Sequence, residues 1–177
     1  DSRLGPNIGE VTINGTLNYG SEGTRFDGKV STDRFDLGRL LNIAELGKVD
    51  MSADGKVSLD KSDSIEGEAR VAIQSAAWGE YDFRDVALQA TKNDTFLTAR
   101  LTSNDPNARL YAEGDGKLDG KESEYNLILN LENIDFGAIG IAPKDKTSWL
   151  AGNMEASLRG GGLDDMVGRA MINNLVY

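Results

Sequence analysis

The sequence contains no cysteine and no histidine. Without thiols or imidazoles the chain can form neither disulfide bonds nor the usual zinc sites, and it lacks every Ser-His or Cys-His nucleophile pair. We therefore predict that the protein is not an enzyme and that it uses no metal or other cofactor. The lack of cysteine suits a bacterial periplasm, where stray thiols would be oxidised, although many cytosolic proteins also lack cysteine.

Long apolar runs are missing as well. No stretch approaches the roughly 18 consecutive apolar residues that a membrane helix needs, and no signal peptide is evident. The first residues, Asp1 to Pro6, do not resemble a natural start, so we expect the chain to be a segment of a longer protein. Aromatic residues make up 7% of the 177 residues, which predicts one domain with a thin, aliphatic core.

Positive charge is in short supply. The chain has 19 basic and 29 acidic residues, and its formal net charge is −10. Such a chain is repelled by a phosphate backbone, which argues against nucleic acid as a partner. The charges are interspersed rather than gathered in a tail, so ordinary solubility explains most of them.

The dominant pattern is alternation, with an apolar residue at every second position. The clearest example runs from Val49 to Leu59, where six alternate positions are apolar or glycine and the positions between them are mostly polar. Alternate side chains of a strand share one face, so each run predicts a strand with one apolar and one polar face, as in an antiparallel sheet solvated on one side. Such runs occupy residues 11–19, 26–30, 49–59, 65–73, 86–90, 97–101, 108–112 and 127–131.

Short polar turns separate these runs at a spacing near ten residues, which is typical of sandwiches, barrels and meanders. The 21 glycines also indicate many turns or bulges, and we assign Gly114-Asp115-Gly116 to such a turn or bulge. One or two helical turns are predicted over residues 36–43, with Asp36 as N-cap. We expect an all-β fold with very little helix.

An internal near-repeat connects the two halves of the chain. Asp36-Leu37-Gly38 recurs as Asp135-Phe136-Gly137, a period of about 100 residues. We align the Gly-led run that starts at Gly47 with the run that starts at Gly152, and the run from Ile65 with the run from Met166. The chain is then one segment, 1–177, with approximate units 1–100 and 101–177, the second truncated. Repeats that stack edge to edge build an elongated, curved antiparallel sheet rather than a closed ball.

The apolar alternation has two interpretations. It either forms the core of a closed sandwich or barrel, or it lines a groove that remains open to a guest. The inward residues are mostly aliphatic or glycine, with few side chains large enough to fill a wide interior, which favours the groove. The predicted lining is Val49, Met51, Val57, Leu59, Val71, Ile73, Leu127, Leu129, Met154 and Leu158.

Two other sets of residues are candidates for chemistry. Asp36 and Asp135 occupy matching repeat positions, but an acid–base pair must lie a few ångströms apart, so capping of short helices is the favoured role. Trp78, Tyr81 and Trp149 offer rings that could stack on sugars, and packing within the protein is the favoured role for them.

Several stretches resemble TamB-type and AsmA-like proteins of the Gram-negative cell envelope, especially those of Bacteroidetes. The resemblance is carried by Phe35 to Asn42, Leu46 to Gly55, Leu101 to Pro106, Gly162 to Ala170, and Leu175 to Tyr177. It covers most of the chain as a loosely spaced pattern.

The resemblance implies a periplasmic segment of a protein anchored in the inner membrane. It implies a long U-shaped sheet, or β-taco, whose apolar groove guides phospholipid acyl chains between the inner and outer membranes. In the translocation and assembly module type it also implies outer-membrane biogenesis with a BamA-like partner, through regions absent from this chain. The alternatives are an interaction module that binds client strands by β-augmentation and a carbohydrate-binding β protein.

Overall fold

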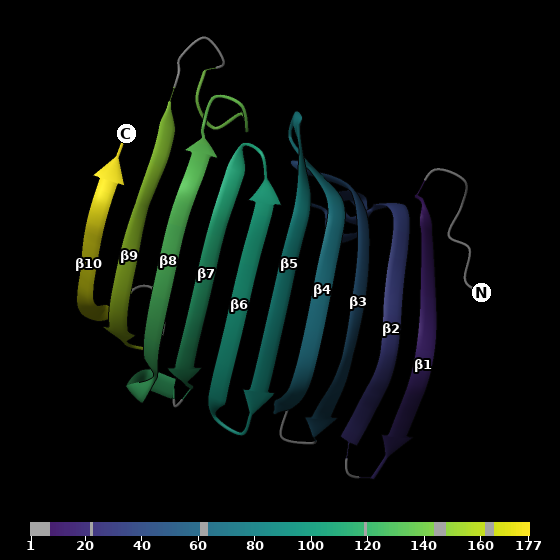
Figure 1. The fold of residues 1–177 in the computed structure, drawn as a ribbon. Coiled ribbons are helices and arrows are strands. Elements are labelled where there is room, and N and C mark those ends of the chain that lie inside the picture. Colours follow the sequence, from purple (N-terminus) through teal and green to yellow (C-terminus); the bar gives the residue numbers. More distant parts are fainter. Residues whose placement is uncertain (1–7, 22, 61–63, 119, 144–147, 162–164) are drawn as a thin grey trace.

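The protein folds into one sheet of ten antiparallel strands (Figure 1). The computed structural model describes residues 8–177 except 22, 61–63, 119, 144–147 and 162–164. The strands are β1 (Glu10–Gly20), β2 (Gly23–Asp36), β3 (Leu46–Asp60), β4 (Ile65–Trp78), β5 (Tyr81–Asn93), β6 (Phe96–Asp105), β7 (Ala108–Lys117), β8 (Glu124–Asp135), β9 (Trp149–Arg159) and β10 (Val167–Val176). Among the described residues, helix is found only in α1 (Leu37–Leu41) and the 3-10 turn η1 (Gly120–Glu122).

Each strand pairs with its neighbours in sequence, so the sheet order is β1 to β10 without a crossover. Connections of two residues join β4 to β5, β5 to β6 and β6 to β7, and such short links force consecutive strands to pair. The strands lie side by side in one bowed layer, with β1 and β10 at opposite edges (Figure 1). The predicted all-β, curved antiparallel fold is confirmed, and the sheet is open rather than closed.

Registers between the strands assign every second residue to one face. Ala53 of β3 lies opposite Val30 of β2 and Val71 of β4, and Val71 lies opposite Leu88 of β5. Directly opposite residues point to the same side of a sheet. We call the side that carries these residues the apolar face and the other side the polar face. The alternation read from the sequence is therefore one continuous surface in the fold.

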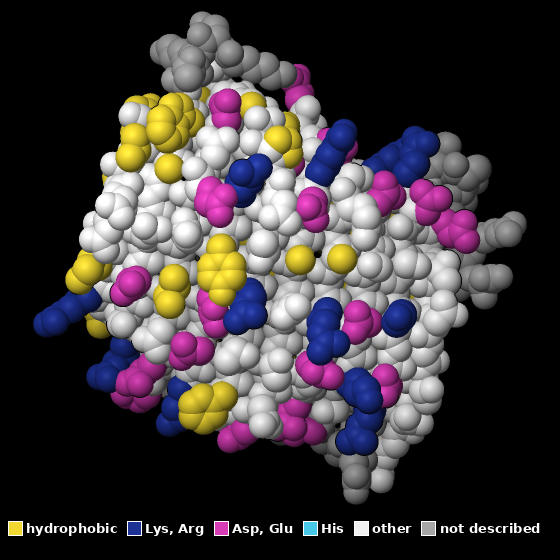
Figure 2. All heavy atoms as spheres, viewed as in Figure 1, with side chains coloured by type: hydrophobic (Ala, Val, Ile, Leu, Met, Phe, Trp, Pro, Cys, Tyr) yellow, Lys and Arg dark blue, Asp and Glu magenta, His cyan; other side chains and the backbone are white. Residues whose placement is uncertain are grey.

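The polar face carries interspersed charges. Figure 2 shows Lys, Arg, Asp and Glu side chains scattered across much of the viewed surface. Several pair across neighbouring strands, including Arg70 with Asp54 at 3.6 Å and Arg100 with Glu113 at 3.2 Å. All four side chains are exposed, so these pairs add little to the stability of the fold. The polar face mainly keeps this side of the sheet in water.

The buried core is small and lies at one margin of the apolar face. There the segment after β8 folds back, and Ile139 packs on Ala108 and Ile134 together with Phe136 and Leu150. A second buried spot lies next to α1, where Phe35 and Val49 are 5% and 3% exposed. α1 packs against β3. Both covering segments follow the Asp-x-Gly motif of the repeat.

The two halves share local geometry at this margin. The backbone N–H of Arg39 donates to Asp36 at 2.9 Å, and that of Ala138 donates to Asp135 at 2.9 Å. The predicted capping of a short helix is confirmed for Asp36, whereas the segment that Asp135 caps is a hydrogen-bonded turn and not a helix. A register shift precedes each aspartate, between Thr32 and Phe35 and between Leu131 and Ile134.

The repeat alignment of β3 with β9 requires a correction. Phe35 lies opposite Val49 and Ile134 lies opposite Leu150, so Val49 corresponds to Leu150. Gly152 then matches Met51 rather than Gly47, because the connection after Asp135 is longer than the one after Asp36. Gly67 and Gly168 do match, since they lie opposite Val57 and Leu158. The division into units 1–100 and 101–177 stays a prediction.

Gly114-Asp115-Gly116 lies inside β7, where the pairing with both neighbours is regular. The predicted turn or bulge is therefore wrong. A Cβ on Gly116 would lie 2.9 Å from Cδ1 of Tyr125, so the glycine makes room for the ring of the opposite residue. Cross-strand packing, and not a change of chain direction, accounts for glycine at this position.

Gly38 provides a test of how tightly α1 packs on β3. A Cβ there would lie 1.5 Å from the carbonyl oxygen of Leu46, so Gly38→Ala must displace backbone. We expect it to lower the free energy of unfolding by about 1–3 kcal/mol, as overpacking does, measured by urea denaturation followed by circular dichroism. Gly20→Ala is the matched control, because nothing lies within 4 Å of its Cβ position. Equal stabilities of the two variants would contradict this packing.

Candidate functional site

The structure places all ten predicted lining residues on the apolar face. Met51 lies opposite Ile73, and Leu129 lies opposite Met154. The remaining members occupy the same alternation on β3, β4, β8 and β9. Their position on one face does not test whether they line a groove for a guest. That prediction remains a hypothesis.

The apolar face is more extensive than the predicted set. Leu88 of β5 and Leu101 of β6 lie opposite each other and join the lining of β4 to that of β8. They were left out of the predicted lining although their runs alternate in the same way. In the fold, these two leucines connect the predicted lining residues of β3 and β4 with those of β8 and β9.

Residues directly opposite one another form rows that cross all ten strands. One row consists almost entirely of glycine and alanine: Gly15, Gly28, Gly55, Ala69, Ala90, Ala99, Gly114, Leu127, Ala156 and Ala170. The next row is larger on most strands: Ile13, Val30, Ala53, Val71, Leu88, Leu101, Ala112, Leu129, Met154 and Ile172. Because the side chains of the first row are small, the apolar face has a shallow depression that runs across the sheet, perpendicular to the strands.

Most of the apolar face is half-buried, because no second layer covers it within the part of the chain that the structure describes. Leu59 is 40% exposed, whereas Val49, beside α1, is 3% exposed. Monomeric soluble proteins rarely leave a contiguous apolar surface of several hundred Å² in water. The apolar face, which spans ten strands, is therefore the candidate functional site of this protein.

A hydrogen-bonded carboxylate fixes the margin of this face. Asp105 is fully buried, and it accepts bonds from Tyr81 Oη at 2.5 Å, from the backbone N–H of Arg84 at 2.9 Å and from that of Asn107 at 2.9 Å. Burial, and next the bond to Asp105, raise the pKa of Tyr81 above its usual value. The network ties the β4–β5 hairpin to the β6–β7 turn.

The sequence predicts only a short polar turn between the runs at 97–101 and 108–112, and this network was not predicted. An available signal was the Asp-Pro-Asn order, since an aspartate at the start of a turn commonly bonds the backbone N–H two residues on. The contacts from Tyr81 and Arg84 could not be read from the sequence, because they span more than 20 residues.

A second polar cluster lies on the opposite side of the sheet. Tyr111 donates to the carboxylate of Glu113, Arg100 bonds the same carboxylate at 3.2 Å, and the Arg100 guanidinium lies 6.0 Å from the centre of the Tyr111 ring. The bond from Tyr111, followed by that from Arg100, lowers the pKa of Glu113. All three side chains belong to the polar face, so the cluster does not line the apolar surface.

The other candidate residues do not converge. Asp36 ends β2 and Asp135 ends β8, with five strands between them in the sheet. Trp78 lies opposite Tyr81 on the apolar side, whereas Trp149 lies opposite Asp135 on the polar side. The two tryptophans therefore share no platform for a sugar. Among the described residues, no group of three acidic side chains is placed to hold a metal ion.

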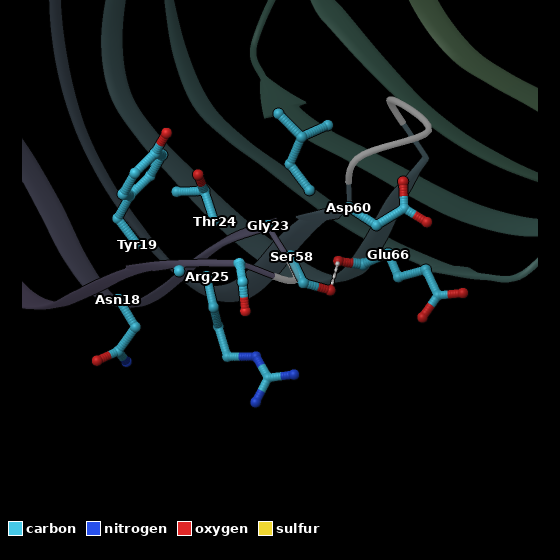
Figure 3. Close-up of a pocket in the computed structure, with 11 residues that line it drawn as sticks. Asn18, Tyr19, Gly23, Thr24, Arg25, Ser58, Asp60 and Glu66 are labelled. Atoms are coloured by element: carbon cyan, nitrogen blue, oxygen red, sulfur yellow. Dashed lines mark hydrogen bonds between the residues drawn. The ribbon is translucent and has the colours of Figure 1, made fainter.

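A hollow of about 520 Å³ lies where β1 and β3 end and β2 and β4 begin. Figure 3 shows Tyr19 and Thr24 on one side of the sheet and Asn18 and Arg25 on the other. Ser58 donates to the carbonyl oxygen of Glu66 at 3.4 Å. Since its side chains diverge around the sheet margin, the hollow brings no set of polar groups together at one point.

Comparison with protein-family models, with curated proteins and with solved structures gives no match for this chain. The resemblance to TamB-type and AsmA-like proteins therefore remains a hypothesis. Within the described ranges, no helix is long and apolar enough to span a membrane.

Asp105 allows a direct test of the margin network. Asp105→Ala leaves the N–H groups of Arg84 and Asn107 without their acceptor, and an unsatisfied buried group costs about 1–3 kcal/mol. We expect a loss of at least that size in the free energy of unfolding, measured by urea denaturation. Asp115→Ala on the polar face is the control and should change stability by less than about 0.5 kcal/mol. Similar losses in both variants would contradict the network.

The raised pKa of Tyr81 predicts a dependence on alkaline pH. A tyrosine whose pKa rises on folding stabilises the protein fully below its unfolded pKa of 10.0, and that contribution is lost as pH rises through the folded pKa. Tyr81→Phe should therefore reduce the loss of stability above pH 10, measured by denaturation at pH 8 to 12. An unchanged alkaline profile would show that the phenol of Tyr81 is free to ionise in the folded protein.

Proposed function

We propose that this chain is a periplasmic segment of a TamB-type or AsmA-like protein, whose apolar face guides phospholipid between the inner and outer membranes. The observation that carries the proposal is one uncovered apolar face that runs without interruption across ten strands. The family resemblance supplies the compartment and the class of cargo. The fold supplies a surface suited to acyl chains.

Burial energetics support an acyl chain as the guest. Each CH₂ group removed from water contributes about 0.8 kcal/mol, and the lining offers aliphatic contacts of similar strength along every strand. A face without strong local anchors lets a chain slide, whereas a pocket with converging polar groups would hold it in one place. The charged polar face keeps the rest of the sheet solvated.

The few charges on the apolar face are placed where they do not obstruct such a path. Lys92 lies near the end of β5, and its ammonium donates to the carbonyl oxygen of Asp94 in the adjoining turn at 2.7 Å. Asp105 lies at the opposite margin and is enclosed by its donors. The central rows between these margins are aliphatic, glycine or alanine.

The role in outer-membrane protein assembly is the finer part of the proposal. It rests on the resemblance to TamB-type proteins, and contact with a BamA-like partner would use regions outside this chain. The apolar face could contribute by supplying lipid to the same site of membrane growth.

A second candidate function is an interaction module that binds client strands by β-augmentation without carrying lipid. The observation that favours it is the exposure of β10, all ten residues of which are exposed. Main-chain groups of an edge strand can pair with an extended segment of another protein. Crosslinks from clients to β10, in a chain that never holds lipid, would favour this function over lipid guidance.

Neighbouring residues on opposite faces give a matched test of lipid guidance. Leu129→Lys places a charge on the apolar face, whereas Ile128→Lys places it on the polar face, where Ile128 is 52% exposed. Met51→Asp and Ser52→Asp form a second such pair. We expect phospholipid to co-purify with the wild type and the polar-face variants after expression in a Gram-negative envelope, and to be lost from Leu129→Lys and Met51→Asp, because an unpaired charge opposes acyl contact.

Native mass spectrometry with lipid extraction measures this occupancy, and circular dichroism establishes that each variant is folded. Undiminished lipid in a folded Leu129→Lys variant would contradict the proposal. A wild-type protein that is free of lipid and ignores added phospholipid would favour the interaction module instead.

A further inference from the structure

The two margins of the apolar face, where the strands turn, differ in how open they are. We call the margin where β5 ends the Lys92 margin and the margin where β6 ends the Asp105 margin; they lie at the bottom and the top of Figure 1. Both covering segments, α1 and the segment after β8, lie at the Asp105 margin. At the Lys92 margin, Leu59 and Ile65 are 40% and 52% exposed. A guest with one water-seeking end therefore fits best with that end at the Lys92 margin.

The margins also differ in the sign of their charge. Among the described residues in the paired rows of the apolar face, Lys92 is the only cation and Asp105 is the only carboxylate. A phospholipid carries an anionic phosphate at one end of its acyl chains. Coulomb interaction favours that end beside Lys92 and opposes it beside Asp105. Access and charge thus favour the same margin for the headgroup.

The ammonium of Lys92 retains donors for an outside acceptor. It donates one hydrogen bond, to the carbonyl oxygen of Asp94 at 2.7 Å, whereas an ammonium has three donors. Within the described chain no carboxylate forms an ion pair with it. The carboxylate of Glu66 instead accepts from the backbone N–H of Asp94 at 3.3 Å. Gly67 lies opposite Lys92 on β4, so that strand places no side chain beside Lys92 in this row.

Tyr125 adds a second side chain suited to a boundary between lipid and water. The row of Lys92 continues through Leu97 and Gly116 to Tyr125. A Cβ on Gly116 would lie 2.9 Å from Cδ1 of Tyr125, so the ring leans from β8 over β7, toward the Lys92 side of the row. Lysine and tyrosine combine an apolar body with a polar end, and both gather at the headgroup level of membranes.

The apolar face is deep enough to hold an acyl chain along the strands. Ala90, Leu88 and Val86 follow Lys92 at successive positions of the face on β5, and Val86 lies about 20 Å from Lys92 at roughly 3.3 Å per residue. One bilayer leaflet has a hydrocarbon depth of about 15 Å, half of the roughly 30 Å core. A chain that starts at Lys92 therefore ends before it reaches the covered residues of the Asp105 margin.

We propose that Lys92 binds the phosphate of a guest phospholipid, so that the headgroup lies at the Lys92 margin and the acyl chains run along the strands toward the Asp105 margin. The inference rests on the proposed function, because it needs phospholipid on the apolar face. A lipid that moves from strand to strand then keeps its headgroup at one margin. Since Lys92 is only half-buried and such ion pairs are weak, it orients the lipid without stopping its movement.

Fluorescence quenching tests the orientation in a chain that has no native cysteine. Ile65→Cys and Ile73→Cys each carry a fluorophore on the apolar face of β4, the first at the Lys92 margin and the second about 26 Å along the strand. Phosphatidylcholine with a spin label on its headgroup should quench the fluorophore at position 65 more strongly. The same lipid labelled at the end of an acyl chain should quench the fluorophore at position 73 more strongly.

Charge removal tests the role of Lys92 itself. Lys92→Gln keeps a donor for the carbonyl oxygen of Asp94 but loses the positive charge. It should weaken the binding of phosphatidylglycerol about two- to fivefold, the size expected for a partly exposed ion pair. Binding of diacylglycerol, which has the same chains and no phosphate, should not change. Lys29→Gln is the matched control, because it removes the same charge from the polar face of β2 and should leave both affinities unaltered.

The outcomes separate this inference from the proposed function. A wild type that binds neither phosphatidylglycerol nor diacylglycerol would overturn both. Equal effects of Lys92→Gln and Lys29→Gln, or equal quenching at positions 65 and 73 in a protein that binds both lipids, would overturn the orientation and leave lipid guidance standing. Lys92→Leu combined with Leu97→Lys moves the cation to the opposite position on β6, and restored phosphatidylglycerol binding in that variant would support a phosphate contact at this margin.

Discussion

The structure depends on one constraint: each strand pairs with its neighbours in sequence, even across the longer segments after β2 and β8, and the result is a single layer. In a sandwich, two sheets cover one another's apolar faces. Here the same alternation produces one apolar face without a partner layer in the described chain, apart from the two segments at its margin. The functional proposal follows from this geometry, because the face that would be a core elsewhere is available to a guest.

The sheet separates its polar and apolar tasks between its two faces. Ion pairs such as Arg70 with Asp54 and Arg100 with Glu113 lie on the polar face, where water screens them and their strength matters little. On the apolar side the buried carboxylate of Asp105 is satisfied by three donors, two from β5 and one from the β6–β7 turn. It secures the margin without placing an open charge in the central rows.

The near-repeat accounts for the two covered places along one margin of the sheet. Asp36 and Asp135 each cap a short segment beside a small buried cluster. The rest of the apolar face has no cover of this kind within the described residues, although side chains of β5 and β7 pack against the cluster beside Asp135.

The sequence by itself determined which segments are strands, which residues share a face, and that Asp36 caps a short helix. These properties are local, since side-chain alternation and capping depend on residues a few positions apart. Only the tertiary structure decided that the sheet stays open, that Leu88 and Leu101 join the face, that Gly114 lies mid-strand, and that Tyr81 reaches Asp105. Such features depend on how registers and bulges accumulate across ten strands. A connection that is two residues longer, as after Asp135, changes which residues of the two repeat units correspond to each other from that point on.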